Sequence, residues 1–139
     1  MGKLSQPTLG YVARSVDNGK TWTSLQLGGS ILKILFNGTH FVAWDYGNVF
    51  KSVDGVNWTS TPRVIDAASG GRWGGPIAYD QKTKTYVSIL SNWGNFYEKQ
   101  KFYRSIDGLN WVTLDATKAK GGHPISYIVS GEIDKAYCP

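Results

Sequence analysis

The chain has 139 residues, with 15 Lys and Arg against 10 Asp and Glu, which makes a formal net charge of +5. This length suits one domain with a core, and an aromatic content of 14% argues against disorder. A single cysteine excludes a disulfide scaffold, and no apolar run approaches the roughly 20 residues that span a membrane. The first residues lack the apolar stretch of a signal peptide, so we expect synthesis in the cytoplasm.

The predicted elements are short strands separated by turns rich in Gly, Asn and Asp. In chain order we expect strands at 11–14, 21–25, 31–36, 39–44, 48–52, 58–61, 75–79, 85–90, 102–105 and 111–114, and two more at 125–129 and 133–137. Asn37-Gly38 predicts a type I′ hairpin turn between two of them. Four short antiparallel strands in a unit of about 40 residues are typical of a β-propeller blade.

Three segments of the sequence repeat one another. They are Ser15-Val16-Asp17-Asn18-Gly19-Lys20-Thr21-Trp22, Ser52-Val53-Asp54-Gly55-Val56-Asn57-Trp58 and Ser105-Ile106-Asp107-Gly108-Leu109-Asn110-Trp111. A Gly-Gly pair begins the apolar run of each unit, at 28–29, 74–75 and 121–122. The repeats predict a single propeller-type domain over 1–139, made of a half-blade at 1–27, blades at 28–61 and 62–117, and a half-blade at 118–139.

These segments resemble the Asp-box, or BNR repeat, of sialidase-like and related β-propellers, whose pattern is Ser/Thr-x-Asp-x-Gly-x-Thr-Trp/Phe. The first segment matches it fully, whereas the other two are one residue shorter and carry Asn57 and Asn110 where Thr is expected. In such a turn the Asp accepts backbone N–H groups, the Gly supplies a positive φ and the Trp buries an apolar face. We therefore expect structural roles for Ser15, Asp17, Gly19, Trp22, Ser52, Asp54, Gly55, Trp58, Ser105, Asp107, Gly108 and Trp111. The resemblance is specific for fold and weak for function.

Three blades cannot close a ring, because known closed propellers have four to eight. We therefore expect self-association, and a twofold homodimer that forms a six-bladed ring is the simplest solution. The half-blades at the two ends would then combine into one composite blade. The alternatives are a fragment of a longer propeller and a propeller-like trimer.

The longest predicted loops lie on the face opposite the three repeated turns. Aromatic rings suit the C–H faces of sugars, and Arg and Asn suit hydroxyls and carboxylates. The candidate ligand-binding residues on this face, including Tyr46 on a shorter loop, are Arg72, Trp73, Trp93, Tyr46, Tyr97 and His123. The alternative is that Trp73 and Trp93 pack under their own loops or at a subunit contact.

Catalytic and metal chemistry has little support in the sequence. A sialidase-like site needs three converging Arg, a Tyr–Glu pair and a further acid, and no such constellation stands out. No pair of carboxylates is distinctive enough for glycoside cleavage, and His40, His123 and Cys138 lack a metal-ligand spacing. We predict no catalytic residue, no metal and no cofactor, and we favour a non-enzymatic role while leaving the enzyme question open.

The leading functional prediction is a non-enzymatic glycan-binding or surface-binding propeller module. Such a protein is similar to lectins and to virion components, such as phage tail or decoration proteins, which act on the virion or outside the cell after assembly or lysis. The alternatives are a fragment or subunit of a sialidase-like glycoside hydrolase, and a pure assembly scaffold. The dispersed positive charge is most simply a solvated surface, and its functional interpretation is attraction to an acidic polysaccharide, lipopolysaccharide or nucleic acid. As partner we expect a glycan or an acidic polysaccharide, and we do not expect nucleic acid.

Overall fold

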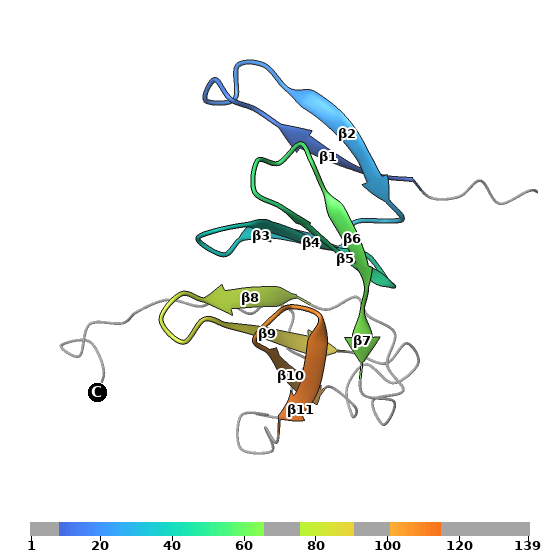
Figure 1. Cartoon of the computed structure of the whole chain (residues 1–139), viewed down its shortest axis with the longest axis vertical. Coiled ribbons are helices and arrows are strands. Elements are labelled where there is room, and N and C mark those ends of the chain that lie inside the picture. The colour runs from blue at the N-terminus through green and yellow to red at the C-terminus, as the bar shows by residue number, and fades with distance from the viewer. Residues whose placement is uncertain (1–8, 66–75, 91–100, 115–139) are drawn as a thin grey trace, which may run out of the picture. The chain divides into compact units, whose positions relative to one another are not determined.

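The computed structural model of the chain describes residues 9–65, 76–90 and 101–114 (Figure 1). Within these ranges the secondary structure is entirely β, with strands β1 (Gly10–Arg14), β2 (Thr23–Gly28), β3 (Lys33–Phe36), β4 (Phe41–Trp44), β5 (Asn48–Ser52), β6 (Thr59–Pro62), β7 (Val64–Ile65), β8 (Ile77–Asp80), β9 (Thr85–Leu90), β10 (Lys101–Ser105) and β11 (Asn110–Leu114). The chain divides into two compact units, 1–63 and 64–139. In the described part of the chain, no helix has the length and apolar character needed to cross a membrane.

The first unit holds two antiparallel sheets. Strands β1 and β2 form a two-stranded sheet, and β3, β4, β5 and β6 form a four-stranded sheet in chain order. Each strand of the second sheet therefore pairs with the strand that follows it, which is the strand order of a propeller blade. The predicted fold class, all-β with four-stranded antiparallel blades, is confirmed.

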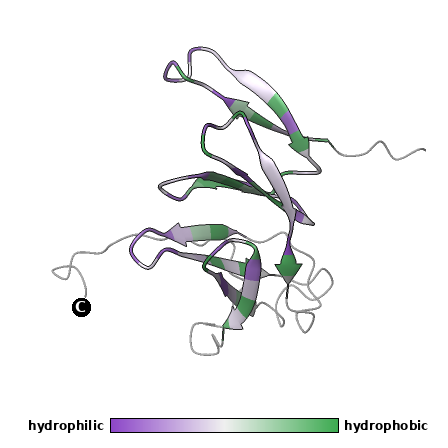
Figure 2. Ribbon diagram, in the orientation of Figure 1, coloured by the Kyte–Doolittle hydropathy of each residue, from purple (hydrophilic) through white to green (hydrophobic). Residues whose placement is uncertain are grey.

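The core of the first unit lies on the two central strands of the four-stranded sheet. Val42, Ala43 and Trp44 of β4 are fully buried, and Val49 and Phe50 of β5 are nearly so. Consecutive residues are buried because both faces of a central strand are covered, so the apolar run replaces an alternating pattern. The outer strand β6 is exposed and polar, and it is pale in Figure 2.

The second unit contains one five-stranded sheet with the order β7-β11-β10-β9-β8. Strands β8 to β11 are antiparallel neighbours in chain order, like the sheet of the first unit. Aromatic side chains fill its core: the rings of Tyr79 and Tyr86 lie 4.5 Å apart between centroids, and those of Tyr86 and Trp111 lie 6.4 Å apart. Tyr86, Tyr103 and Trp111 are all buried.

The fifth strand of this sheet, β7, was not predicted. Val64 and Ile65 pair in parallel with Asn110 and Trp111, and the Val64 N–H donates to the Leu109 carbonyl at 3.2 Å. A segment of two apolar residues is too short to show the alternating pattern that predicts a strand. Its parallel pairing with a strand distant in the sequence is also not marked by a tight turn between the two. The strand is hydrophobic, as Figure 2 shows, and it occupies an edge of the blade that would otherwise be open.

The prediction of a type I′ turn at Asn37-Gly38 is wrong. Phe36 pairs with Phe41, so the loop has four residues, and only Gly38 has a positive φ, of 97°. The Asn37 side chain closes the loop instead, because its Oδ1 accepts the Thr39 N–H at 3.0 Å and the His40 N–H at 2.8 Å. Asn commonly bonds to the backbone two residues on, which competes with a two-residue hairpin.

The predicted C-terminal strands, at 125–129 and 133–137, lie outside the described residues. The proposed half-blade and blade boundaries therefore stay predictions.

Candidate binding surfaces

Three turns of the chain share one hydrogen-bond pattern. They join β1 to β2, β5 to β6, and β10 to β11. In each, a Ser hydroxyl donates to the Asp two residues later at 2.8 to 2.9 Å and accepts the N–H of the turn Gly at 2.8 to 2.9 Å. The same Asp accepts backbone N–H groups from the far side of the turn at 2.8 Å. The Ser and Asp pairs are Ser15 and Asp17, Ser52 and Asp54, and Ser105 and Asp107.

In two of the turns Asn replaces Thr, and the side-chain hydrogen bond to the turn Asp is kept. The Asn57 side-chain amide donates to Asp54 Oδ2 at 2.8 Å, and that of Asn110 donates to Asp107 Oδ2 at 2.7 Å. In the first turn the Thr21 hydroxyl donates to Asp17 Oδ2. The longer Asn side chain reaches the carboxylate from a turn that is one residue shorter, so the two sequence variants are equivalent in chemistry.

The extra residue of the first turn is absorbed by the backbone. Asn18 and Gly19 both have positive φ values, of 57° and 82°, whereas each shorter turn has one such residue, Gly55 at 74° or Gly108 at 75°. Asn tolerates this region better than most side chains do, because its short polar group bonds locally. The insertion therefore keeps the bonds of the Asp to the Ser hydroxyl, to the side chain at the Thr or Asn position and to the N–H of that residue.

The turn carboxylates are ionised at neutral pH. Hydrogen bonds from the Thr21 hydroxyl and N–H lower the pKa of Asp17 to about 2. Burial acts to raise the pKa of Asp107, but hydrogen bonds from Asn110, Leu109 and Ser105 outweigh it and bring the pKa to about 2. The pKa of Asp54 is lowered in the same way, first by the N–H groups of Asn57 and Val56. A carboxyl that is ionised and fully engaged as an acceptor is a poor proton donor.

The tryptophans after the turns differ in burial. Trp111 is 3% exposed, as expected of a turn anchor, but Trp22 is 63% exposed, which was not expected. Both indole N–H groups donate to the carbonyl of the turn Gly, at 3.1 Å for Trp111 and 3.0 Å for Trp22. Trp58 is half-buried, and its indole nitrogen has no hydrogen-bond partner among the described residues.

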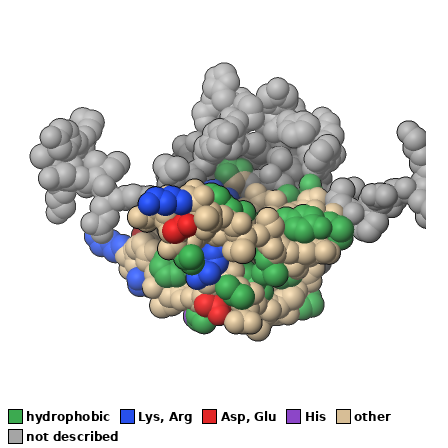
Figure 3. All heavy atoms as spheres, turned by 90° about the horizontal axis from the view of Figure 1, so that it is seen from above, with side chains coloured by type: hydrophobic (Ala, Val, Ile, Leu, Met, Phe, Trp, Pro, Cys, Tyr) green, Lys and Arg blue, Asp and Glu red, His purple; other side chains and the backbone are tan. Residues whose placement is uncertain are grey.

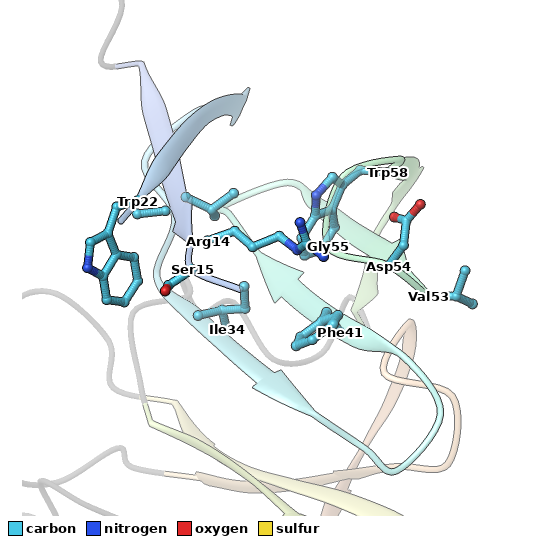
Figure 4. Close-up of a pocket in the computed structure, with 11 residues that line it drawn as sticks. Arg14, Ser15, Trp22, Ile34, Phe41, Val53, Asp54, Gly55 and Trp58 are labelled. Atoms are coloured by element: carbon cyan, nitrogen blue, oxygen red, sulfur yellow. The ribbon is translucent and has the colours of Figure 1, made fainter. Parts of the chain in front are cut away.

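The first unit has a groove of about 510 Å³ between its two sheets, at the end where the first two turns lie (Figure 4). Its lining is mostly apolar, with Arg14 and Asp54 as the charged members. Figure 4 shows the Arg14 side chain reaching from β1 toward Gly55 and Trp58, with Trp22 on the opposite side. The lining residues are Val12, Ala13, Arg14, Ser15, Trp22, Ile34, Phe41, Val53, Asp54, Gly55 and Trp58.

Several apolar side chains of this groove are open to solvent. Trp22, Val53 and Ile34 are exposed, and the view from the side of β1 and β2 shows separate hydrophobic groups with Lys and Arg between them (Figure 3). Sequence reasoning missed the groove because its residues come from strands and turns that are far apart along the chain. One residue could have indicated an exposed apolar surface here: Val53, an apolar residue within a turn that is otherwise polar.

At the opposite end of the four-stranded sheet, Asp45 closes the turn between β4 and β5. It is 5% exposed, and its Oδ1 accepts the N–H groups of Gly47 at 2.8 Å and Asn48 at 2.6 Å. Burial acts to raise the pKa of Asp45, but these bonds and those from the Asn48 amide and Gly29 hold it below its ordinary value. The turn backbone is therefore fixed from inside by a buried anion.

Tyr46 stands on this fixed turn and is 53% exposed. Arg63 holds the same turn from the chain segment after β6: its Nη2 donates to the Tyr46 carbonyl and its N–H to the Gly47 carbonyl, both at 2.9 Å. Gly28 completes the support, because a Cβ there would lie 2.6 Å from Phe50 Cζ and 3.2 Å from Asp45 Oδ2. The Tyr46 ring is thus presented to solvent on an immobilised backbone.

The other predicted ligand-binding residues, Arg72, Trp73, Trp93, Tyr97 and His123, lie outside the described residues. Their assignment as ligand-binding residues therefore stays a prediction. Among the residues that it does describe, no three His, Cys, Asp or Glu side chains gather in a way that could hold a metal ion.

Comparison with known proteins gives one finding about the fold. The chain matches no protein-family model and no curated protein. Its structure is similar to the crystal structure of an ancestral GH74 enzyme, a glycoside hydrolase of the β-propeller type, with a TM-score of 0.55 and 16% sequence identity. The match covers 78% of this chain and 15% of that chain. At this identity the likeness supports a propeller-type fold and leaves activity open.

Proposed function

We propose that this chain is a non-enzymatic, carbohydrate-binding module of a β-propeller whose blades are closed by Asp-box turns. The observation that carries the binding role is the exposed Tyr46 ring on a turn immobilised by Asp45 and Arg63. A flat aromatic ring gives sugar C–H groups a surface to stack on, and a rigid backbone lowers the entropic cost of binding. The likeness to a glycoside hydrolase fold supports glycan over other ligands.

The three turns support the Asp-box assignment. Each joins the last two antiparallel strands of its sheet in chain order, and each repeats the same bonds among Ser, Asp and Gly. The long loops that carry Arg72, Trp73 and Trp93 would extend the binding surface from Tyr46.

Glycan-array screening of the purified chain, with two variants of Tyr46, tests the binding role. Tyr46→Ala removes the stacking ring and should weaken binding of the best glycan at least tenfold, whereas Tyr46→Phe keeps the ring and should stay within about threefold. Ile106→Ala, which removes an exposed apolar side chain from the repeated turn of the second unit, is the control. Absence of any bound glycan, or a Tyr46→Ala variant that binds like the unmodified chain, would contradict the proposal.

A second candidate is a fragment or subunit of a glycoside hydrolase, which the likeness to a GH74 enzyme favours. Release of reducing sugar ends from polysaccharide by the purified chain would support it. Because the match covers 15% of that enzyme, the paired carboxylates that hydrolysis needs would then come from other parts of the assembled protein.

A further inference from the structure

Four dipeptides of this chain place an Asn or Asp directly before a Gly. They are Asn18-Gly19, Asn37-Gly38, Asp54-Gly55 and Asp107-Gly108, and all four lie within the described ranges. The backbone nitrogen of such a Gly can attack the side-chain carbonyl carbon of the residue before it, which closes a five-membered succinimide ring. Glycine permits this attack best because it has no side chain to shield the nitrogen. The hydrogen bonds of the folded chain decide which of the four nitrogens can react.

In the three repeated turns, the glycine nitrogen is already engaged in a hydrogen bond. The Ser hydroxyl that begins each turn accepts this N–H at 2.8 to 2.9 Å, in the pairs Ser15 and Gly19, Ser52 and Gly55, and Ser105 and Gly108. A nitrogen held in this way must break its hydrogen bond before it can give up its proton and attack. The Ser of each turn therefore protects the backbone from ring closure in addition to closing the turn.

The loop between β3 and β4 leaves its glycine nitrogen open (Figure 1). Gly38 is exposed, and its N–H has no hydrogen-bond partner in the part of the chain that the structure describes. It also lies outside the ladder between the two strands, which ends at the pair of Phe36 and Phe41. Water and dissolved base can therefore reach the Gly38 nitrogen and remove its proton.

The side-chain carbonyl of Asn37, which this nitrogen would attack, is polarised by three donors. Its Oδ1 accepts the Thr39 N–H and the Thr39 hydroxyl, both at 3.0 Å, and the His40 N–H at 2.8 Å. Such donors draw electron density from the carbonyl carbon and stabilise the negative charge that the oxygen gains during attack, as an oxyanion hole does. They also hold the side chain over the backbone that follows Asn37, where the Gly38 nitrogen lies.

We propose that Asn37 is a self-modifying site, at which the folded chain converts the amide into aspartate and isoaspartate. The Gly38 nitrogen forms a bond to Asn37 Cγ, the Cγ–Nδ2 bond breaks, and the proton lost by the Gly38 nitrogen reaches the departing amide through solvent, which releases ammonia. Water then opens the succinimide. Its attack at Cγ gives aspartate at this position, and its attack at the backbone carbonyl carbon of Asn37 gives isoaspartate. Water is the only co-reactant.

The two products change the loop in different ways. Aspartate keeps the length of the side chain, so it accepts the bonds from Thr39 and His40 with a full negative charge, which strengthens them. Isoaspartate carries the side-chain carbon into the main chain and lengthens the backbone by one atom, so the loop bonds and the pairing of Phe36 with Phe41 cannot all be kept. Either product lowers the formal net charge of +5 by one.

Peptide mapping by mass spectrometry tests the proposal, with Asn18 of the same chain as the matched control. The purified chain is incubated at mildly alkaline pH, and each conversion adds about 1 Da to its peptide. In the folded chain Asn37 should convert at least about tenfold faster than Asn18. In concentrated urea, where the protecting and polarising bonds are lost, the two rates should agree within about threefold. Equal rates in the folded chain, or slower conversion of Asn37 in the folded chain than in urea, would overturn the proposal.

Two variants test protection and activation separately, in chains that keep their β circular dichroism. Ser15→Ala frees the Gly19 N–H and should speed conversion of Asn18 at least about fivefold, while Asn37 in the same sample stays unchanged. Thr39→Val removes the hydroxyl donor but keeps the N–H, and should slow conversion of Asn37 at least about threefold. An unchanged Asn18 rate in the first variant would overturn the protection by Ser, and an unchanged Asn37 rate in the second would overturn the activation.

Discussion

A single carboxylate organises each repeated turn, and Asp107 illustrates how. It accepts two backbone N–H groups, one side-chain amide and one hydroxyl, which together join the two strands that the turn connects. Asp107→Ala leaves these donors without their partner, and we expect a loss of about 2 kcal/mol in the free energy of unfolding, measured in urea. Asn110→Thr, whose shorter side chain cannot reach Asp107 from this turn, removes one of these bonds and should lower that free energy by about 1 kcal/mol. Equal losses for both variants would refute this account of the turn.

Acid should weaken the fold through these same carboxylates. The pKa of Asp107 is about 2 in the folded chain against an ordinary value of 3.8, and that of Asp17 is also about 2. A lowered pKa stabilises the folded state fully above about pH 4, and this contribution disappears as the pH falls toward 2. Thermal melts between pH 6 and pH 2 should show Tm falling mainly below pH 4. An Asp107→Asn chain should lose less Tm over that interval, and a flat profile for the unmodified chain would contradict the prediction.

Residue roles were partly readable from the sequence. The Asp, Gly and Trp positions follow from turn chemistry, because a tight turn needs an acceptor and a positive φ. The double role of the Ser hydroxyl, which donates to the Asp and accepts from the Gly N–H, was missed. Hydrophobic periodicity gives no information about the hydrogen bonds of a hydroxyl group. The buried Asp45 was missed as well, because burial of an acid depends on packing from Gly28 and Gly29 that is distant in sequence.

At the scale of strands and turns, two glycines beside β5 provide a matched pair. Gly55 has a φ of 74°, and a Cβ there would meet Arg14 Cδ at 3.3 Å, whereas a Cβ on Gly47 would meet nothing within 4 Å. Gly55→Ala should therefore lower the free energy of unfolding by at least about 1 kcal/mol, while Gly47→Ala should be neutral within about 0.5 kcal/mol. Urea titration of both chains measures the difference, and similar values would show that the positive φ is not needed.

Strand positions were predicted well where apolar residues are flanked by turn residues. The predicted bounds 48–52 and 85–90 are those of β5 and β9. The errors lie where a contact distant in sequence or a side chain decides the backbone: β7 exists through its pairing with β11, and the Asn37 amide turns a two-residue hairpin into a four-residue loop. Local patterns carry no information about either effect.

At the scale of the whole molecule, the fold could be read from the repeats, but the groove beside β1 could not. A repeated unit of four strands constrains the architecture strongly, because each unit must bury its faces against neighbours. A groove depends on which side chains from distant elements meet, and no periodicity encodes that. The predicted glycan surface depends on long loops whose sequence specifies composition but no backbone path.

Two tryptophans in equivalent positions should contribute differently to stability. Trp111 is 3% exposed, so Trp111→Ala should lower the free energy of unfolding by about 3 to 5 kcal/mol. Trp22 is 63% exposed, so folding removes little of its ring from water. Trp22→Ala should therefore lower the free energy of unfolding by about 1 kcal/mol or less. Urea unfolding of both variants measures the two losses, and equal losses would show that burial of the ring does not set its contribution.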